Sequence, residues 1–256
     1  MAAIEVHEVH KTFRIPHERH TTLTERVLSV LRPPTYERFE ALRGVDLELE
    51  AGSFVGIIGR NGSGKSTLLK VIAGLLVPDQ GYVRVEGTMC ELLELGLGFS
   101  PELTVQENVA LYAAVLGYPR RDVAARVESA IQFAELERFR DAKLKNLSTG
   151  MALRLGFATA LQADSEIILL DEILAVGDEE FQHKCLDTFI DFKRRRKTVV
   201  LVSHDLSEVQ RFCDQVILFD AGQIVARGAA AEVIAQYHAL VEHAPPAPSV
   251  AAGAKR

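Results

Sequence analysis

Short apolar and β-branched runs alternate with longer stretches of helical periodicity along most of the chain. This alternation is typical of an α/β domain with a mostly parallel sheet. Between the apolar runs at 81–86 and 166–170, residues 104–162 have the pattern of several helices. Ala125, Val127, Ile131 and Ala134 recur there at helical spacing. The pattern therefore predicts an α/β core with an inserted helical subdomain. The predicted strands cover residues 4–9, 45–50, 54–58, 81–86, 166–170, 198–202, 215–219 and 223–226.

The end of the chain departs from this pattern. Residues 243–256 carry Pro245, Pro246 and Pro248 among alanines, a composition typical of a flexible tail. We therefore expect one folded domain over residues 1–242, with the tail outside it.

A short amphipathic helix is predicted within residues 21–31. Four apolar residues share one face of it, and the helix ends before Pro33. It is too short to span a membrane. From periodicity alone, this face could pack equally well on the domain core or on a partner protein. The four residues are Leu23, Val27, Val30 and Leu31.

The charge and the cysteine content limit the cellular compartment and the classes of binding partner that we expect for this protein. Lysine and arginine total 29 against 35 aspartates and glutamates, a net charge of −6, so the charge balance gives no reason to expect nucleic acid. No apolar run approaches the ~18 residues of a membrane span, and the amino terminus lacks the features of a signal peptide. Cys90, Cys185 and Cys213 lack metal or redox spacing, which indicates buried thiols of a reducing compartment. We therefore expect a cytosolic protein whose membrane role, if any, is peripheral.

A glycine-rich loop directly follows the predicted strand at 54–58. It satisfies the pattern G-x-x-x-x-G-K-[ST] and precedes the helical run 68–76, which is the strand, loop and helix order that the pattern requires. The glycines let backbone N–H groups turn toward phosphate oxygens, the helix presents its positive end, Lys65 neutralises charge on the β- and γ-phosphates, and Ser66 can ligate Mg²⁺. The loop predicts an ATP-type nucleotide site. Its residues are Gly59, Arg60, Asn61, Gly62, Ser63, Gly64, Lys65, Ser66 and Thr67.

Two adjacent acidic residues, Asp171 and Glu172, end the apolar strand at 166–170. Because side chains alternate along a strand, the two carboxylates point in different directions and can do different work. We expect Asp171 to hold Mg²⁺, and Glu172 to orient the attacking water and accept its proton. A solvated strand end is the alternative, and the phosphate loop in the same chain favours the catalytic interpretation.

The segment 147–151 reads L-S-T-G-M and resembles the L-S-G-G-Q signature of ABC (ATP-binding cassette) ATPases. Ser148 and Gly150 match the signature, whereas Thr149 replaces a glycine and a methionine replaces the glutamine. Ser148 precedes Asp171 by 23 positions, as in the layout of that family. Without the resemblance, Ser148 or Thr149 is simply the capping residue of a helix, and both interpretations can hold.

The resemblance implies a P-loop NTPase core of the ABC-ATPase type, with an inserted helical subdomain at about 104–162 and a small antiparallel β element. It also implies ATP and Mg²⁺ as ligands and a homodimer with two composite sites. In such a dimer, Ser148 and Gly150 of one chain face the ATP bound by the other chain.

Three further positions follow from the family's order of motifs. Asp178 falls in the D-loop, and His204 falls at the histidine that senses the γ-phosphate. Phe13 stands where the family has an aromatic residue that stacks on adenine. A core position for Phe13 is an equal alternative, and Tyr36 or Phe39 could replace it as the stacking residue.

One expected element, the glutamine of the Q-loop, is missing. Residues 91–98 read E-L-L-E-L-G-L-G in its place, and Glu94 is the nearest polar substitute. Together with the altered signature and an insertion over about residues 14–40, this segment resembles the ATPase subunit of bacterial polysaccharide exporters.

That narrower resemblance implies ATP hydrolysis coupled to export of a lipid-linked glycan, such as O-antigen or teichoic acid. Two integral-membrane permease subunits would carry the glycan, and the chain would lie at the cytoplasmic face of the bacterial inner membrane. Because similar exporters carry an insertion at 14–40, the helix predicted within it is expected to lie against the transmembrane partner.

Other functions remain as alternatives. One is the ATPase of a different ABC exporter, for a lipid or a drug. Another is a soluble ABC ATPase of translation or DNA repair, which a single cassette with a net charge of −6 does not favour. A regulatory module that does not hydrolyse ATP would more naturally lack Glu172 or His204.

Overall fold

The computed structural model describes four stretches of the chain, residues 2–16, 36–92, 98–171 and 177–242. Several predicted features lie outside the described residues: the helix at 21–31, Glu94, Glu172 and the tail at 243–256.

Nine strands are present in the described residues: β1 (Ala2–Pro16), β2 (Tyr36–Glu50), β3 (Phe54–Ile58), β4 (Gln80–Val85), β5 (Met89–Leu92), β6 (Ile167–Asp171), β7 (Thr198–Val202), β8 (Gln215–Asp220) and β9 (Gln223–Gly228). The α-helices of this part of the chain are α2 (Lys65–Ile72), α3 (Val105–Val115), α4 (Arg120–Ala134), α5 (Thr149–Ala160), α6 (Glu179–Arg194), α7 (Leu206–Phe212) and α8 (Ala230–Glu242). Two short 3₁₀ turns, η2 (Glu137–Phe139) and η3 (Leu144–Asn146), lead from α4 to α5.

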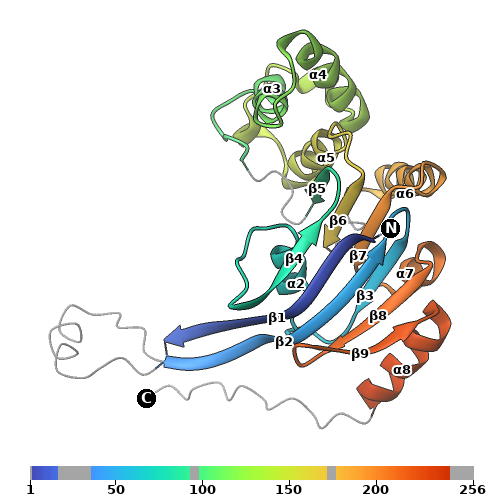
Figure 1. Cartoon of the computed structure of the whole chain (residues 1–256). Helices are drawn as coiled ribbons and strands as arrows, with labels where there is room; N and C mark the ends of the chain where they lie inside the picture. The colour runs from blue at the N-terminus through green and yellow to red at the C-terminus, as the bar shows by residue number, and fades with distance from the viewer. Residues whose placement is uncertain (1, 17–35, 93–97, 172–176, 243–256) are drawn as a thin grey trace, which may run out of the picture.

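The larger sheet has six strands in the order β5-β6-β7-β3-β8-β9 (Figure 1). All neighbours in it are parallel except β8 and β9, which form an antiparallel hairpin. Its central strands are buried along their whole length, as expected for parallel strands that are covered on both faces.

Alternate residues of these strands belong to two separate hydrophobic cores. Phe54 and Leu201 face the core beneath α5, α6, α7 and α8, whereas Ile57 and Val202 face the core shared with α2 and the antiparallel sheet. The unbroken apolar runs in the sequence therefore divide between two faces, because successive side chains of a strand point in opposite directions.

The smaller sheet is antiparallel, with the order β2-β1-β4. Strands β1 and β2 continue past this sheet as a two-stranded ribbon, which projects from the body of the molecule in Figure 1. The ribbon includes residues 14–16 and 36–40, the two ends of the predicted insertion, and Arg14 pairs with Arg38 across it. Extended strands therefore lead into and out of residues 17–35.

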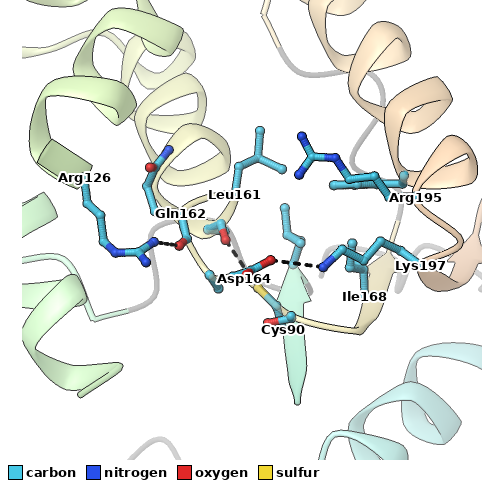
Figure 2. A pocket seen from close by; sticks show the side chains of 13 residues that line it. Cys90, Arg126, Leu161, Gln162, Asp164, Ile168, Arg195 and Lys197 are labelled. Atoms are coloured by element: carbon cyan, nitrogen blue, oxygen red, sulfur yellow. Dashed lines mark hydrogen bonds and ion pairs between the residues drawn. The ribbon is translucent and has the colours of Figure 1, made fainter. Parts of the chain in front are cut away.

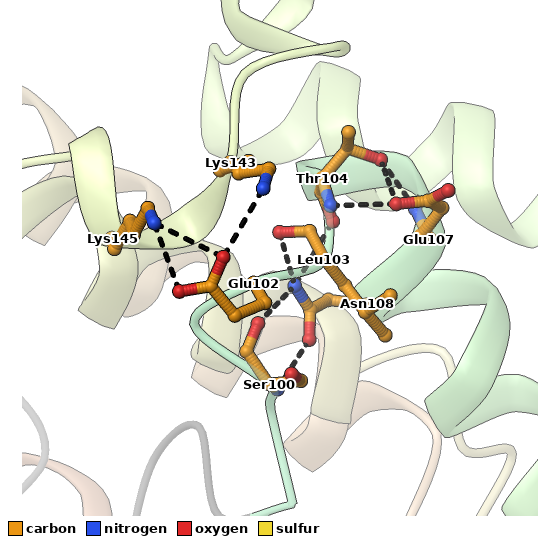
Figure 3. Close-up of polar contacts among 8 residues, drawn as sticks. All are labelled: Ser100, Glu102, Leu103, Thr104, Glu107, Asn108, Lys143 and Lys145. Atoms are coloured by element: carbon orange, nitrogen blue, oxygen red, sulfur yellow. Dashed lines mark hydrogen bonds and ion pairs between the residues drawn. The ribbon is translucent and has the colours of Figure 1, made fainter.

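The helical subdomain consists of α3, α4 and the first part of α5, around a third core that includes Val105, Ile131 and Leu155. It stands at one end of the molecule in Figure 1. Asn108 is fully buried in it. The Asn108 amide nitrogen donates to the carbonyl oxygens of Ser100, Leu103 and Thr104, and its oxygen accepts the Ser100 N–H at 2.7 Å (Figure 3). One side chain thus organises the loop that leads into α3.

The structure confirms the predicted fold class and all eight predicted strands: β3 and β7 have the predicted bounds, and the other six strands have shifted bounds. Strands β1 and β2 are much longer than predicted, because the ribbon is exposed and its polar residues hid the strand pattern. Strand β5 was not predicted. It has four residues, includes the polar Glu91 and forms the edge of the sheet beside β6, so its sequence has little strand signal of its own.

No helix in the described part of the chain is long and apolar enough to cross a membrane. The prediction of buried thiols is confirmed: Cys90, Cys185 and Cys213 are buried and unbridged. Burial raises the pKa of each thiol to about 12, so these cysteines are packing residues rather than nucleophiles.

The buried amide predicts a stability effect. Replacing Asn108 with alanine leaves the Ser100 N–H without the side-chain oxygen that accepts it, and removes the amide from three carbonyls that each keep a backbone donor. The free energy of unfolding should therefore fall by ~1–3 kcal/mol. Urea unfolding followed by circular dichroism measures it. Glu102→Gln is the control, because that exposed carboxylate bridges the exposed Lys143 and Lys145 (Figure 3), and exposed ion pairs contribute little to stability. Equal decreases in the free energy of unfolding in the two variants would contradict the role given to Asn108.

Candidate functional site

Three adjacent strands deliver the candidate residues to one edge of the larger sheet. Across β3, β7 and β6, Ile57 pairs with Val202, and Val202 pairs with Asp171, so these residues stand in one row. The phosphate loop begins two residues after Ile57, and His204 lies two residues after Val202. The carboxyl ends of parallel strands form the usual ligand edge of such sheets. Segments up to 145 residues apart in the sequence therefore meet at this edge.

The phosphate loop follows β3 in a conformation that depends on glycine. Gly59, Gly62 and Gly64 all have positive φ angles, of 152°, 78° and 110°. A Cβ atom at Gly59 would lie 2.0 Å from the carbonyl oxygen of Phe219, and one at Gly64 would lie 2.4 Å from that of Ala41. The loop is thus pressed against the end of β8 and against β2, and no side chain fits at either position.

The loop opens directly into the N-terminus of α2. Gly64 is the N-cap residue of this helix and, among the described residues, no side chain caps it and no acidic residue occupies its first turn. The N–H groups and the positive end of the dipole are therefore available to an anion. Lys65 is buried, and its Nζ donates to the carbonyl oxygens of Gly59 and Arg60 at 2.9 Å each. The ammonium is thus held at the loop, where it would meet phosphate oxygens.

A cavity of about 350 Å³ lies over this loop and helix end. Its described lining consists of Phe39, Asn61, Gly62, Gly64, Lys65, Ser66 and Thr67.

The aromatic residue in this lining is Phe39, which the sequence offered as an alternative to Phe13. The two residues pair directly across β1 and β2, so their rings lie on the same face of the ribbon. Phe39 is 43% exposed, whereas Phe13 is half-buried and lies 6.0 Å from the Lys11 ammonium. The cavity thus pairs a phosphate-binding end with an exposed ring, which is the shape that a nucleotide requires.

Ser66 and Asp171 are the two oxygen donors expected to hold Mg²⁺. Ser66 lines the cavity, and Asp171 ends β6 half-buried. A hydroxyl and one carboxylate fit this ion, because Mg²⁺ usually keeps several waters and binds phosphate oxygens beside one or two protein groups.

The loop after β7 has a rigid internal structure. The Ser203 hydroxyl accepts the Asp205 N–H at 3.0 Å and donates to the Glu208 carboxylate, and Asp205 caps α7 by accepting the Ser207 and Glu208 N–H groups. The Ser207 hydroxyl, which also donates to Asp205, is the main reason that the pKa of this carboxyl lies below its ordinary value. His204 is exposed on this braced loop, near the carboxyl ends of the strands.

The signature segment is the N-terminus of α5. Ser148 is its N-cap, and the Ser148 hydroxyl accepts the Met151 N–H at 3.2 Å, which confirms the capping interpretation for Ser148. Ser148 is exposed, and a Cβ atom at Gly150 would meet nothing within 4 Å. Neither residue is part of the described lining of the phosphate-loop cavity. Within one chain, the structure therefore does not bring the two motifs together.

Asp178 also has a structural role, as the N-cap of α6. Its Oδ1 accepts the Phe181 N–H at 3.1 Å, and this bond is the largest cause of the lowered pKa of the carboxyl. Its Oδ2 accepts from Arg154 of α5. Arg154 was not singled out in the sequence, because nothing local marks it as different from any other helical arginine.

A second cavity, of about 330 Å³, lies beside the amino-terminal ends of β6 and β7. Arg126, Arg195 and Lys197 line it, but each has a partner (Figure 2). Arg126 donates to the Gln162 carbonyl oxygen at the end of α5, and Lys197 pairs with Asp164 at 3.1 Å. Arg195 pairs with the preceding turn of α6. Arg126 thus compensates the C-terminal end of α5, and the other two cations are paired with carboxylates, so the phosphate-loop cavity is the better candidate site.

Comparison with known proteins agrees with this geometry. A protein-family profile described as "ABC transporter" matches residues 42–175, which is 134 of the 256 residues. The chain is 43% identical over 247 residues to the O-antigen export system ATP-binding protein RfbB of Myxococcus xanthus, covering 94% of this chain and 56% of that protein. It is 38% identical over 206 residues to the teichoic acids export ATP-binding protein TagH of Listeria monocytogenes, covering 80% and 61%.

Among solved structures, the chain is similar to a dimeric ATP-binding cassette in a post-hydrolysis state, bound to ADP and Pi. The TM-score is 0.72 at 26% identity, over 89% of this chain and 98% of the other. The phosphate loop, the sheet edge, the profile match and these relatives lead to the same assignment. The chain belongs to the ABC transporter family.

Proposed function

We propose that this chain binds and hydrolyses ATP as the motor subunit of an exporter of lipid-linked polysaccharide. The observation that carries the proposal is the glycine loop at the carboxyl edge of the sheet, with the uncapped N-terminus of α2 and the buried Lys65 behind it. Because phosphoryl transfer depends mainly on positioning and charge stabilisation, a site with these parts is suited to it.

Each candidate residue has a role in this proposal. Residues 59–67 hold the phosphates, and Lys65 neutralises charge on the β- and γ-phosphates. Ser66 and Asp171 would hold Mg²⁺, which supplies further charge neutralisation at the transferred phosphate. Glu172, one residue beyond the described end of β6, orients the attacking water and accepts its proton. His204, on its braced loop, contacts the γ-phosphate.

The second half of the site comes from another copy of the chain. Ser148 is exposed and Gly150 half-buried at the N-terminus of α5, a place that favours anions, and both lie outside the described lining of the phosphate-loop cavity of their own chain. In a dimer, the N-terminus of each α5 would face the ATP bound by the other chain. This arrangement would use the anion-favouring helix end and would explain why that end lies outside the cavity of its own chain.

The transport cargo is inferred from the relatives. The relatives are named for O-antigen export and for teichoic acids export. A lipid-linked glycan is the cargo class that we propose on the strength of these names. We propose that the glycan passes through two separate permease subunits and that these hold the chain at the cytoplasmic membrane face. Export of another lipid or of a drug is the competing possibility, and a permease gene next to glycosyltransferase genes would argue against it.

Lys65→Ala should weaken MgATP binding by at least about tenfold, because hydrogen bonds to charged groups contribute ~1.5–3 kcal/mol each. Calorimetric titration with MgATP measures the effect. Lys70→Ala is the matched control, since Lys70 lies on the same helix about 7.5 Å further along its axis. Unchanged affinity in Lys65→Ala would overturn the assignment of the phosphate loop.

Phe39→Ala should weaken ATP binding by about 5- to 100-fold, because stacking of a base on an aromatic ring contributes ~1–3 kcal/mol. Phe13→Ala, which changes the opposite residue of the same ribbon, should have a smaller effect, since Phe39 is the ring that lines the cavity. Fluorescence titration of both variants with ATP shows which of the two phenylalanines contacts the adenine. A larger loss in Phe13→Ala would assign the adenine contact to Phe13 instead.

Glu172→Gln should lower the rate of ATP hydrolysis by ~10²–10⁴-fold, because it removes the general base while keeping the size of the side chain. The affinity for MgATP should stay within about twofold of the wild-type value, since Glu172 acts in the chemical step and does not contribute to binding of the ground state. Phosphate release and equilibrium binding measure the two quantities. Glu179→Gln, in the exposed first turn of α6, is the control and should keep the wild-type rate. Wild-type turnover in Glu172→Gln would remove this residue from the mechanism.

A further inference from the structure

Four charged residues link α4, α5 and α6 to one another. We call Glu135, Arg154, Asp178 and Lys184 the α4–α5–α6 ion cluster. Arg154 of α5 contacts Glu135, which follows α4, at 3.4 Å, and it also pairs with Asp178, the N-cap of α6. Lys184 of α6 pairs with Glu135 from the other side.

Arg154 is the best-buried member of the cluster. Its side chain is 16% exposed, against 64% for Asp178, and its guanidinium lies 5.1 Å from the centre of the Phe181 ring. Arginine can stack on a ring and bind carboxylates in the plane of the guanidinium at the same time. Arg154 therefore has a fixed place between α5 and the start of α6.

The segment at Gly177 and Asp178 fits closely against this arginine. Gly177 has a φ of +81°, and a Cβ atom there would lie 3.1 Å from Nε of Arg154 and 3.0 Å from Cβ of Phe181. Of the Asp178 oxygens, Oδ1 accepts the Phe181 N–H and Oδ2 accepts from Arg154. Both carboxylate oxygens are therefore used inside the chain.

Arg154 also joins two parts of the proposed composite site. It lies six residues after Ser148 on the same helix, and Asp178 lies six residues after Glu172. A shift of α5 relative to the larger sheet would therefore move the Asp178 segment through this contact.

We propose that Arg154 is a positioning residue for ATP hydrolysis, which acts by holding the Asp178 segment in register with α5. Asp178 contributes to the site through this contact and through its cap on α6. This inference rests on the proposed ATPase function, because it concerns how the two halves of that site are aligned.

The test is a double-mutant cycle in the full chain. Arg154→Met removes the charge and keeps an unbranched side chain over Phe181. Asp178→Asn keeps an oxygen for the helix cap, since asparagine caps as well as aspartate. For each variant and for the double variant, kcat and KM of ATP hydrolysis, the Kd for MgATP and the melting temperature are measured.

We expect each single change to lower kcat by about tenfold, within the range of coupling energies of residues in contact. The double variant should be no slower than the slower single variant, and the Kd for MgATP should stay within about twofold throughout. Arg154→Lys should recover part of the lost kcat. Lys184→Met is the matched control: it removes another ion pair of the same cluster without touching Asp178, and kcat should be unchanged.

Three results would overturn the inference: an unchanged kcat in Arg154→Met despite a lower melting temperature, multiplicative losses in the double variant, or a loss of MgATP affinity as large as the loss of kcat. If Arg154→Met does not fold, Arg154→Lys takes its place in the cycle. Multiplicative losses of kcat in the double variant would then overturn the inference in the same way. A wild-type chain that does not hydrolyse ATP would overturn the proposed function instead.

Discussion

The close approach of the phosphate loop to two other backbone segments is the constraint on which the site depends. The loop presses against the end of β8 at Gly59 and against β2 at Gly64. The turn between β8 and β9 adds to this support, because Gly222 donates its N–H to the Ser63 carbonyl oxygen at 2.8 Å and accepts the Arg43 N–H at 2.9 Å. A loop with three positive φ angles is costly in isolation, and these contacts hold it in its anion-binding shape.

The larger sheet makes that support possible. Its central strands are buried on both faces, by helices on one side and by α2 with the antiparallel sheet on the other, so they have little freedom to slide. With the register fixed, Asp171 and the loops after β3 and β7 must meet at one edge. The antiparallel sheet then brings Phe39 over the same edge. The positions of the phosphate loop, Asp171, His204 and Phe39 follow from this one packing arrangement.

The helical subdomain is attached to this core through α5. Helix α5 belongs to both the subdomain core and the core beneath the larger sheet, and the Arg154 contacts tie it to the start of α6. Inside the subdomain, the buried Asn108 fixes the loop before α3. The signature end of α5 is thus held in place but lies outside the described lining of the phosphate-loop cavity of its own chain, a geometry that suits a site shared between two copies.

Local pattern alone determined much of this protein. The phosphate loop, Asp171 at a strand end and the Ser148 cap depend on residues close together in the sequence, so they could be predicted before the fold was known. The eight predicted strands have apolar runs that only a sheet buried on one or both faces can use. The glycines at 59 and 64 were identified by motif, although the atoms that exclude a side chain there come from 41 and 219.

Only the tertiary structure decided the remaining features. Strand β5 exists because β6 offers a paired edge, not because its four residues favour a strand. The sequence left Phe13 and Phe39 as alternatives, since their order across the ribbon and the cavity beneath it are set by pairing over 26 residues. Arg154 has no local signal at all. Its importance arises from the meeting of α5 with the end of α4 and the start of α6, and contacts between distant segments leave no periodicity in a single sequence.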